Sequence, residues 1–242
     1  MEEISVLIPI YNSYGIIESS VRRLVDVLSE RSDDFEIVLR DDGSKDESNY
    51  VMHRLSQRFP QVRCFYNQCN RGLGYTLRSM FKDCTGESIV YCDCDLPFGA
   101  EIIPRMVSEL SAYDIVVASR YKGISSKGSL IRKFFSRMYY MLCKLLFNIP
   151  VLDIGSGTVA MKRNIVEQLM FYSDGFDIHA EFYVSAADAG FSIKEIPASA
   201  KDNYAGSFSI LRHSAAVIKG TFRLWTRRQT QRRDLLFLPY AK

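Results

Sequence analysis

The sequence predicts an α/β protein with a mostly parallel central sheet flanked by helices and with amphipathic helices toward its C-terminus. Short apolar runs alternate with longer segments of helical periodicity, which is typical of strand-helix-strand units. Polar residues directly follow several of these apolar runs. The chain has 242 residues, of which 47% are hydrophobic and 24% charged, a length and composition that suit one large globular domain.

Six short apolar runs bounded by polar residues or glycine are the predicted strands. They are Ile4 to Ile10, Phe35 to Leu39, Val62 to Tyr66, Ser88 to Cys92, Asp114 to Ala118 and Ser192 to Ile196. Most of them are rich in Val and Ile, as expected for strands buried on both faces.

Seven segments between or after these runs are the predicted helices. Residues 16 to 31 are the clearest, because Ile16, Val21, Leu24, Val25 and Leu28 fall on one helical face. The others are Asp46 to Phe59, Gly74 to Asp83, Glu101 to Leu110, Leu130 to Phe147, Ile178 to Ala189 and Phe208 to Leu224. Gly155 and Gly157 predict a glycine-rich turn between the last two strands.

No internal repeat or low-complexity linker divides the chain. We expect one domain over residues 1–222, in which residues 1–120 form an α/β nucleotide-binding half and residues 121–222 an acceptor-binding half. Residues 223–242 form a basic and apolar tail.

Charge and cysteine content exclude several classes of protein. Lys and Arg total 31 against 28 Asp and Glu, and the net charge of +3 is too small to suggest a nucleic-acid binder. The six cysteines lack the paired spacing of a zinc site, so we expect reduced thiols in a cytoplasmic protein. The N-terminus has no signal-peptide pattern and no 18-residue stretch is free of charge, so we expect no spanning helix.

Two basic and apolar segments raise the question of membrane contact. Residues 120–152 carry seven basic residues and no acidic one, and the helix within them can either lie on an anionic membrane or pack its wide apolar face in the core. Residues 223–242 carry six basic residues and one acidic one beside an apolar cluster. We expect this tail to dock on anionic lipid, with pairing to another subunit in a homo-oligomer, or folding back on the domain, as alternatives.

Polar residues after the predicted strands are the candidates for a binding site, because ligands of parallel sheets bind at the carboxyl ends of the strands. Tyr11 and Asn12, then Asp41 and Asp42, then residues 70–74, and then Asp93 and Asp95 occupy such positions. In extended geometry Asp93 and Asp95 would point to the same side and face one divalent cation. Carboxylate ligands favour Mg²⁺ or Mn²⁺, which also take phosphate oxygens from a substrate.

Taken together, these segments resemble family 2 glycosyltransferases with the GT-A fold, which has a Rossmann-like sheet. The resemblance is carried by SVLIPIYN (5–12), RDDGSKD (40–46), NRGLGYTL (70–77) and CDCDL (92–96). Further along, ASRY (118–121), DIGSG (153–157), GFDIHAEF (175–182) and AGFSIKEIP (189–197) are similar to the dolichyl- or polyprenyl-phosphate glycosyltransferase branch.

The resemblance implies a role for each matching residue. Asp93 and Asp95 would hold the metal on the donor diphosphate, and Arg120 and Arg132 would bind donor or acceptor phosphate, which the planar guanidinium suits. The residues placed around the nucleoside are Pro9, Tyr11, Asn12, Asp41, Asp42 and Gly72.

The reaction implied is inverting transfer of a sugar from a nucleotide-diphosphate sugar to a polyprenyl phosphate, undecaprenyl or dolichyl, by an enzyme peripheral on the inner face of the membrane. This chain departs from the family's usual pattern at Ser13, at Thr158 and Val159, and at Pro97, which follows the second metal aspartate by two residues. Residues 201–210 also lack the terminal basic motif. An enzyme extending a hydroxyl of a lipid-linked or surface glycan is therefore an alternative, with Glu181 or Asp177 as general base. A non-catalytic nucleotide-sugar-binding subunit is a second alternative. We expect His179 to face solvent. The nucleoside of the donor can be uridine or guanosine, since a carboxylate at Asp41 or Asp42 could bond either.

Overall fold

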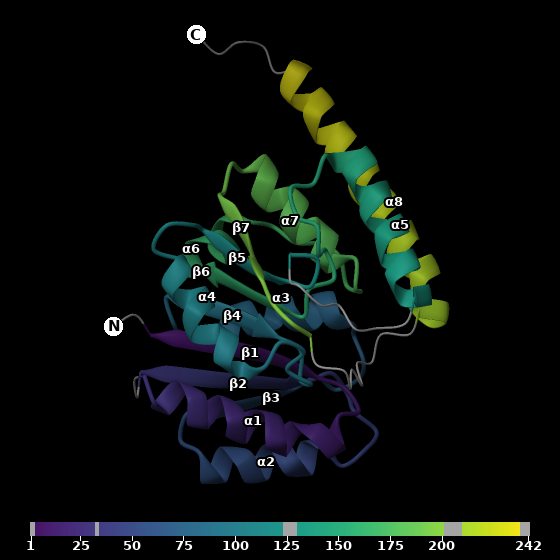
Figure 1. The fold of residues 1–242 in the computed structure, drawn as a ribbon. Coiled ribbons are helices and arrows are strands. Elements are labelled where there is room, and N and C mark those ends of the chain that lie inside the picture. The colour runs from purple at the N-terminus through teal and green to yellow at the C-terminus, as the bar shows by residue number, and fades with distance from the viewer. Residues whose placement is uncertain (1–2, 32–33, 123–129, 201–209, 238–242) are drawn as a thin grey trace.

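A single seven-stranded sheet organises the chain, as seen in a computed structural model that describes residues 3–31, 34–122, 130–200 and 210–237 (Figure 1). The strand order is β3-β2-β1-β4-β6-β5-β7. The strands are β1 Ile4–Ile10, β2 Phe35–Asp41, β3 Val62–Tyr66, β4 Ser88–Cys92, β5 Ile115–Ser119, β6 Thr158–Lys162 and β7 Ile193–Pro197. Six of them run in one direction, and β6 alone is antiparallel to its neighbours β4 and β5.

All six predicted strands are confirmed to within two residues at each end, but β6 was missed. The sequence analysis predicted only a glycine-rich turn in this part of the chain. Only Val159 to Met161 of β6 are apolar, and this run closely follows the glycines of the predicted turn, so the local pattern does not separate it from a loop. They become a strand because they fill the gap between β4 and β5, which is a tertiary effect.

The helices cover both faces of the sheet. They are α1 Tyr14–Ser29, α2 Ser48–Arg58, α3 Leu73–Asp83, α4 Ile103–Glu109, α5 Leu130–Phe147, α6 Arg163–Gln168, α7 Ile178–Asp188 and α8 Ile210–Phe237, with a 3₁₀ turn at Ala100–Ile102 before α4. The short helix α6 was not predicted. The others correspond to predicted helices, and α8 runs thirteen residues further than predicted, from Leu224 to Phe237.

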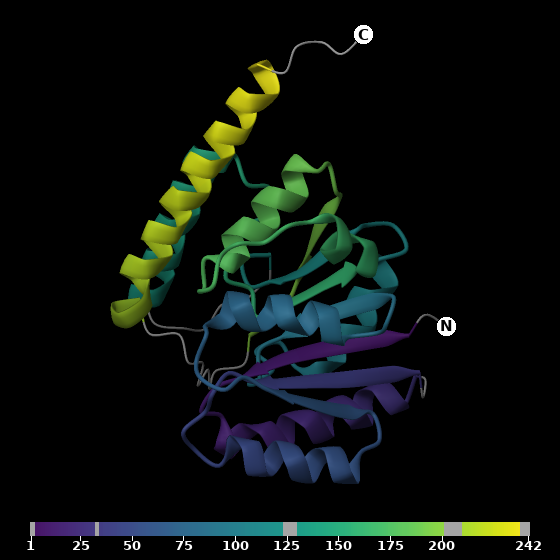
Figure 2. The same cartoon turned by 180° about the vertical axis from the view of Figure 1, so that it is seen from behind.

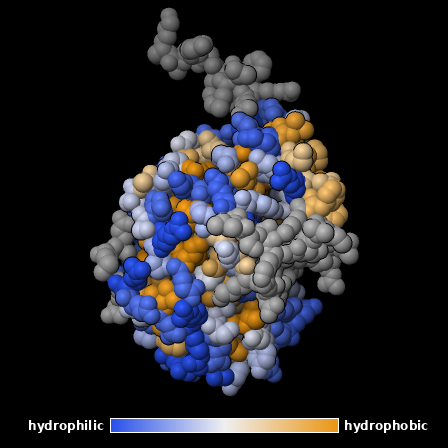
Figure 3. All heavy atoms as spheres, viewed as in Figure 1, coloured by the Kyte–Doolittle hydropathy of each residue, from blue (hydrophilic) through white to orange (hydrophobic). Residues whose placement is uncertain are grey.

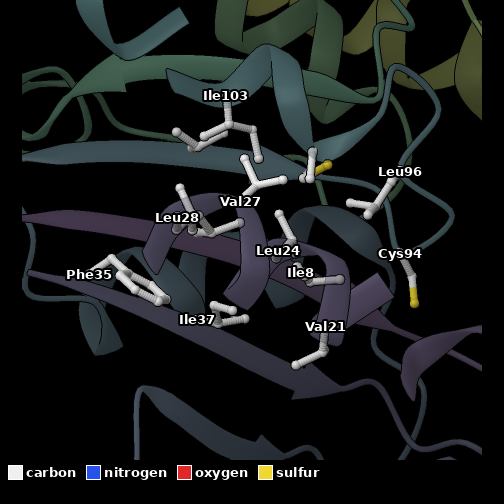
Figure 4. Packing of buried hydrophobic residues seen from close by; sticks show 14 of the residues in the cluster. Ile8, Val21, Leu24, Val27, Leu28, Phe35, Ile37, Cys94, Leu96 and Ile103 are labelled. Carbon is white, nitrogen blue, oxygen red and sulfur yellow. The ribbon is translucent and has the colours of Figure 1, made fainter. Parts of the chain in front are cut away.

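Two apolar layers form the core because successive strand residues point to opposite faces. Ile8 of β1 and Ile37 of β2 pack against α1, where Leu24 meets them (Figure 4). Their neighbours Leu7 and Val38 belong to the layer on the other face, with residues of α3 and α7. The face of α1 predicted from its periodicity is the buried one.

Helices α5 and α8 lie side by side along one flank of the molecule (Figures 1 and 2). The hydroxyl groups of Tyr139 on α5 and Thr221 on α8 are 3.0 Å apart and hydrogen-bonded. Because α8 is continuous, it crosses residue 222, where we expected the domain to end and a tail to begin. Within the described residues, no helix has the length and apolar character needed to cross a membrane.

Candidate active site

The loops that follow β1 and β2 meet at one edge of the sheet, as expected from the parallel pairing of Ile10 with Asp41. Asn12 joins them: its backbone N–H donates to the Ser44 hydroxyl over 2.8 Å, and its side-chain oxygen accepts the Lys45 N–H over 2.8 Å. Asn12 has a φ of 50°, a left-handed conformation that asparagine tolerates better than most residues. Pro9, the first residue predicted to lie near the nucleoside, precedes this junction in β1.

Asp41 and Asp42 are buried, and their carboxylates hold the surrounding loops in place. Asp41 accepts the Ser44 N–H over 2.9 Å, which closes the turn after β2. Asp42 accepts the N–H groups of Arg71 and Gly72 over 2.9 and 2.8 Å, and the Asn67 amide over 2.8 Å. The pair therefore shapes the predicted nucleoside site through backbone N–H groups; a direct contact with the nucleoside stays a prediction.

Gly72 lies where two loops approach closely. Its φ is 91°, and a Cβ atom added there would lie 2.4 Å from the Asp174 carbonyl oxygen. The same carbonyl oxygen accepts the Gly74 N–H over 2.7 Å. Residues 70–74, which we call the donor turn, are thus clamped between Asp42 and the loop at 172–174, here called the clamp loop.

Asp93 and Asp95 follow β4, which lies next to β1 in the sheet. The Tyr91 hydroxyl donates to the Asp93 carboxylate, and the Asp93 N–H donates to the Gly157 carbonyl oxygen over 2.8 Å. The segment is not extended as expected, because the Leu96 N–H bonds the Asp93 carbonyl oxygen over 3.0 Å and closes a turn. A tight turn, rather than the alternation of a strand, therefore sets the directions of the two carboxylates.

These carboxylates suit a divalent cation. Gly157 leaves the room that Asp93 occupies, since a Cβ atom at Gly157 would lie 2.3 Å from an Asp93 carboxylate oxygen. No group of three or more His, Cys, Asp or Glu side chains is arranged to hold a metal ion in the described part of the chain. Two carboxylates with phosphate and water oxygens completing the shell is the arrangement that Mg²⁺ prefers. The donor set thus fits the predicted Mg²⁺ or Mn²⁺.

Arg120 forms a two-point ion pair with the buried Asp153. Its Nε and Nη2 atoms donate to the two Asp153 carboxylate oxygens, each over 3.0 Å, and Nη2 also donates to the Gly155 carbonyl oxygen over 2.7 Å. These bonds anchor residues 153–157, which carry Gly157 beside Asp93. The structure thus shows Arg120 supporting the metal-site loop, whereas phosphate binding by Arg120 stays a prediction. Arg132 lies in the first turn of α5, and its side chain is outside the described residues.

The candidate bases Glu181 and Asp177 both lie toward α8. Glu181 is only 1% exposed, and one oxygen accepts the N–H groups of Tyr172 and Ser173 over 3.0 and 2.7 Å. Its other oxygen accepts from Arg227 over 2.8 Å. A buried carboxylate engaged on both oxygens is poorly placed to take a proton from an acceptor hydroxyl. Asp177 precedes α7, and its carboxylate lies against Gly220.

His179 does not face solvent, contrary to expectation. Its Nε2 atom is buried, and its ring meets the Tyr91 ring edge-on with 5.6 Å between centroids. Burial lowers the pKa of this imidazole, and the nearby Asp93 carboxylate raises it by less. With Tyr91, Phe81, Phe171 and other apolar residues, His179 lines a small cavity of about 30 Å³. It packs behind the Tyr91 hydroxyl that holds Asp93.

Several supporting residues were missed by the sequence analysis. Tyr91 lies in the predicted strand Ser88 to Cys92, and Asp153 and Gly157 lie in the DIGSG motif, but only the fold shows that they meet Asp93 and Arg120. Arg227 was expected to face lipid, and it instead bonds Glu181. Arg228 likewise pairs with Asp188 of α7, so this part of the predicted tail folds back on the domain.

Comparisons with known proteins agree with this geometry. Residues 5–170 match the family described as Glycosyl transferase family 2. Glycosyltransferase AglD of Haloferax volcanii is 29% identical over 205 residues, which is 81% of this chain and 32% of AglD. The undecaprenyl-phosphate 4-deoxy-4-formamido-L-arabinose transferase of Pseudomonas fluorescens is 28% identical over 69% of this chain and 49% of its own length. This chain therefore spans about a third to a half of the length of these relatives.

The fold has a solved counterpart. Glucosyl-3-phosphoglycerate synthase from Mycobacterium tuberculosis, in a complex with Mn²⁺, uridine-diphosphate-glucose and phosphoglyceric acid, has a TM-score of 0.72 at 19% identity, over 93% of this chain and 80% of that one. This likeness confirms the predicted α/β fold of the GT-A type. The match over residues 5–170 covers most of the chain, and the chain therefore belongs to glycosyl transferase family 2.

Proposed function

We propose that this protein is a metal-dependent inverting glycosyltransferase that moves a sugar from a nucleoside-diphosphate donor to a polyprenyl phosphate at a membrane surface. The main support for the donor part of this proposal is the position of Asp93 at the carboxyl edge of the sheet. The Tyr91 hydroxyl bonds its carboxylate, and Gly157 leaves room for it. The name of the Pseudomonas relative supports the acceptor.

Asp93 and Asp95 would hold the cation together with the donor diphosphate. When bound, the cation stabilises the negative charge that develops on the leaving diphosphate. Arg120 and Asp153 keep the loop at 153–157 in place, so that Gly157 continues to leave room for the Asp93 carboxylate. Asp42 orients the donor turn through the Arg71 and Gly72 N–H groups.

The state of Glu181 favours a phosphate acceptor over a hydroxyl. A phosphate monoester is anionic at neutral pH and attacks the anomeric carbon without a strong general base. A hydroxyl needs such a base, and both oxygens of Glu181 already accept hydrogen bonds from within the chain. Asp177 is then the remaining candidate base for the hydroxyl reaction.

An exposed apolar surface on α5 and α8 supports action at a membrane. Apolar side chains gather on the flank where these two helices lie (Figure 3). On α5 the exposed apolar side chains recur at helical spacing, and α8 adds two more one turn apart. They are Phe134, Phe135, Met138, Met141 and Leu145 of α5, and Ile218 and Phe222 of α8. Arg137, Lys219 and Arg223 are exposed on the same two helices, and basic side chains beside an apolar stripe favour anionic lipid.

This lipid-facing surface also lies beside the predicted site. The Tyr121 hydroxyl, just after β5, is 2.6 Å from the Ser136 hydroxyl of α5. The carboxyl end of β5 therefore contacts the helix that would rest on the bilayer. A phosphate carried at the end of a membrane lipid would need such proximity to reach the donor.

In the decisive experiment, the protein is incubated with Mn²⁺ or Mg²⁺, a pool of nucleotide sugars and a short polyprenyl phosphate. The products are identified by mass spectrometry. We expect a glycosyl-phosphoryl-polyprenol that is absent with Asp95→Ala and present with Asp26→Ala, an exposed aspartate of α1. Metal-dependent nucleotide binding without this product would instead indicate a hydroxyl acceptor or a binding subunit. Undiminished product with Asp95→Ala would contradict the metal assignment.

Vesicle co-sedimentation tests the membrane surface separately. The variant that combines Phe134→Ser, Met138→Ser and Met141→Ser should bind phosphatidylglycerol-containing vesicles about 10-fold or more weakly than the wild type. The reason is that three apolar side chains no longer enter the membrane interface. Tyr50→Ser on α2 is the matched control, since Tyr50 is 61% exposed and Phe134 63%. Equal binding by the triple variant and the wild type would remove α5 from the membrane contact.

A further inference from the structure

We infer that Arg227 and Glu181 are positioning residues for the donor: together they hold the clamp loop, which in turn holds the donor turn against the nucleotide. This inference rests on the proposed function, because it takes residues 70–74 to be part of the donor site. It assigns Glu181 a role other than that of a general base. It also connects α8, one of the two helices with the exposed apolar surface, to the carboxyl edge of the sheet, where we propose that the donor binds.

The connection begins with an ion pair between α7 and α8 in which the carboxylate is buried and the guanidinium is partly exposed. Glu181 is 1% exposed and accepts from the Arg227 Nη1 atom over 2.8 Å. The Arg227 guanidinium also stacks on Tyr172, with 4.1 Å from its central carbon to the ring centroid. Arg227 therefore contacts both the carboxylate and the start of the clamp loop.

Glu181 then holds the backbone of the clamp loop. Its second oxygen accepts the N–H groups of Tyr172 and Ser173 over 3.0 and 2.7 Å. Hydrogen bonds to an ionised acceptor are stronger than neutral ones, so the charge of Glu181 matters for the loop. Arg227 in turn offsets the cost of burying that charge.

The clamp loop finally holds the donor turn. The Asp174 carbonyl oxygen accepts the Gly74 N–H over 2.7 Å, and it lies so close to Gly72 that no side chain fits there. From the other side, Asp42 accepts the Gly72 N–H over 2.8 Å. Arg78 of α3 adds hydrogen bonds to the Ser173 carbonyl oxygen and the Asp174 carboxylate.

The consequence concerns donor affinity more than the chemical step. Without Arg227, Glu181 is a buried charge that has lost its cationic partner, and the loop that it holds must adjust. The donor turn loses a fixed partner at Asp174, whereas no contact in the series involves Asp93 or Asp95. We therefore expect a higher Kd and a higher donor KM with little change in kcat at saturating donor.

Calorimetric titration of the full chain with UDP and with GDP, in the presence of Mn²⁺, tests this without any acceptor. For whichever nucleotide binds the wild type, Arg227→Gln should raise the Kd by about 3- to 30-fold, the usual range for coupling through a contiguous network. Arg227→Lys should recover part of the loss, because it keeps the charge next to Glu181. Where transfer is measurable, the change should appear in the donor KM.

Arg228→Gln is the matched control, because Arg228 follows Arg227 on α8 and pairs with Asp188 at the far end of α7, away from the clamp loop. It should leave the Kd within about 2-fold of wild type, as for a site outside the network. Thermal unfolding of both variants separates general destabilisation from the effect on the nucleotide.

Arg78→Gln keeps the inference testable if Arg227→Gln fails to fold, since Arg78 reaches the clamp loop from the surface of α3. It should also raise the Kd for the nucleotide. The double variant Arg78→Gln/Arg227→Gln should lose less binding free energy than the sum of the losses of the two single variants, because both act through one loop. Wild-type affinity in both Arg78→Gln and a folded Arg227→Gln would overturn the inference while leaving the donor site in place. A wild type that binds neither nucleotide would overturn the proposed function and the inference together.

Discussion

Helices α1 and α5 are both amphipathic, yet the apolar face of α1 is buried and much of the apolar face of α5 is exposed. On α1, Leu24 is 0% exposed and packs against the sheet. On α5, Leu145 is 84% exposed although it belongs to an equally apolar stripe. A helical pattern of apolar residues therefore identifies a face that avoids water, but it does not identify what covers that face. On α1 the sheet covers it, and on α5 we propose that lipid does.

The largest expected effect contrasts these two leucines. Leu24→Ala should lower the free energy of unfolding by about 2–5 kcal/mol, because it leaves a cavity in a packed core. Leu145→Ala should change it by no more than about 0.5 kcal/mol, because the side chain is already in solvent. Urea denaturation monitored by circular dichroism measures both. A comparable loss at Leu145 would mean that this face of α5 is covered within the protein.

A second contrast concerns two glycines in the loop between α5 and β6. Gly157→Ala should lower metal-dependent activity by about 10- to 100-fold, because the added methyl group displaces the Asp93 carboxylate, and small misplacements in a site are costly. Gly155→Ala should be nearly silent, since no atom lies within 4 Å of its added Cβ. The measurement is the Mn²⁺ dependence of transfer or donor hydrolysis. Equal activity in the two variants would show that Asp93 does not need this space.

The smallest expected effect is a pH dependence of stability that arises from Glu36 of β2. Burial raises the pKa of Glu36, but hydrogen bonds from Ser5, Thr85 and Arg63 outweigh it and lower the pKa below the usual 4.5. The native state thus holds the ionised form more tightly than the unfolded state does. Its contribution is complete above about pH 4.5 and is lost as the pH falls through the lowered pKa.

Glu36→Gln isolates this contribution. The wild type should be more stable than the variant by about 1–2 kcal/mol near neutral pH, roughly the difference between hydrogen bonds to a charged group and to a neutral one. The difference should shrink as the pH is lowered below about 4.5. Urea titrations at several pH values measure it, and a difference that grows in acid would contradict the lowered pKa.

Much of the fold was predictable because its signals are local. The five-residue run Ser88–Cys92 and the periodicity of α1 need only neighbouring residues to be recognised. The same holds for polar residues at strand ends, which is why Asp93 and Asp95 could be predicted as metal ligands; that role stays a prediction. The turn that Asp93 and Asp95 share was not foreseen, because its closing hydrogen bond to Leu96 competes with extended geometry only in the folded chain.

The supporting contacts were not predictable, because their partners lie far apart in the chain. Arg120 and Asp153 are 33 residues apart, and Glu181 and Arg227 are 46 apart. An arginine in a basic segment has the same local sequence signal whether it faces lipid or a buried carboxylate. Arg227 was therefore assigned to the membrane, and only the packing of α8 on α7 showed its partner.

By itself, the sequence determined six of the seven strands, the longer helices, the family and the residues at the carboxyl ends of the strands, since periodicity, composition and short motifs specify each of these locally. The tertiary structure alone decided the antiparallel insertion of β6, the ion pairs of Arg120 and Arg227, and the burial of Glu181 and His179. These depend on which surfaces meet once the chain is folded. The free energy of a charge or an apolar face depends on what packs against it, and that neighbour is set by the whole fold.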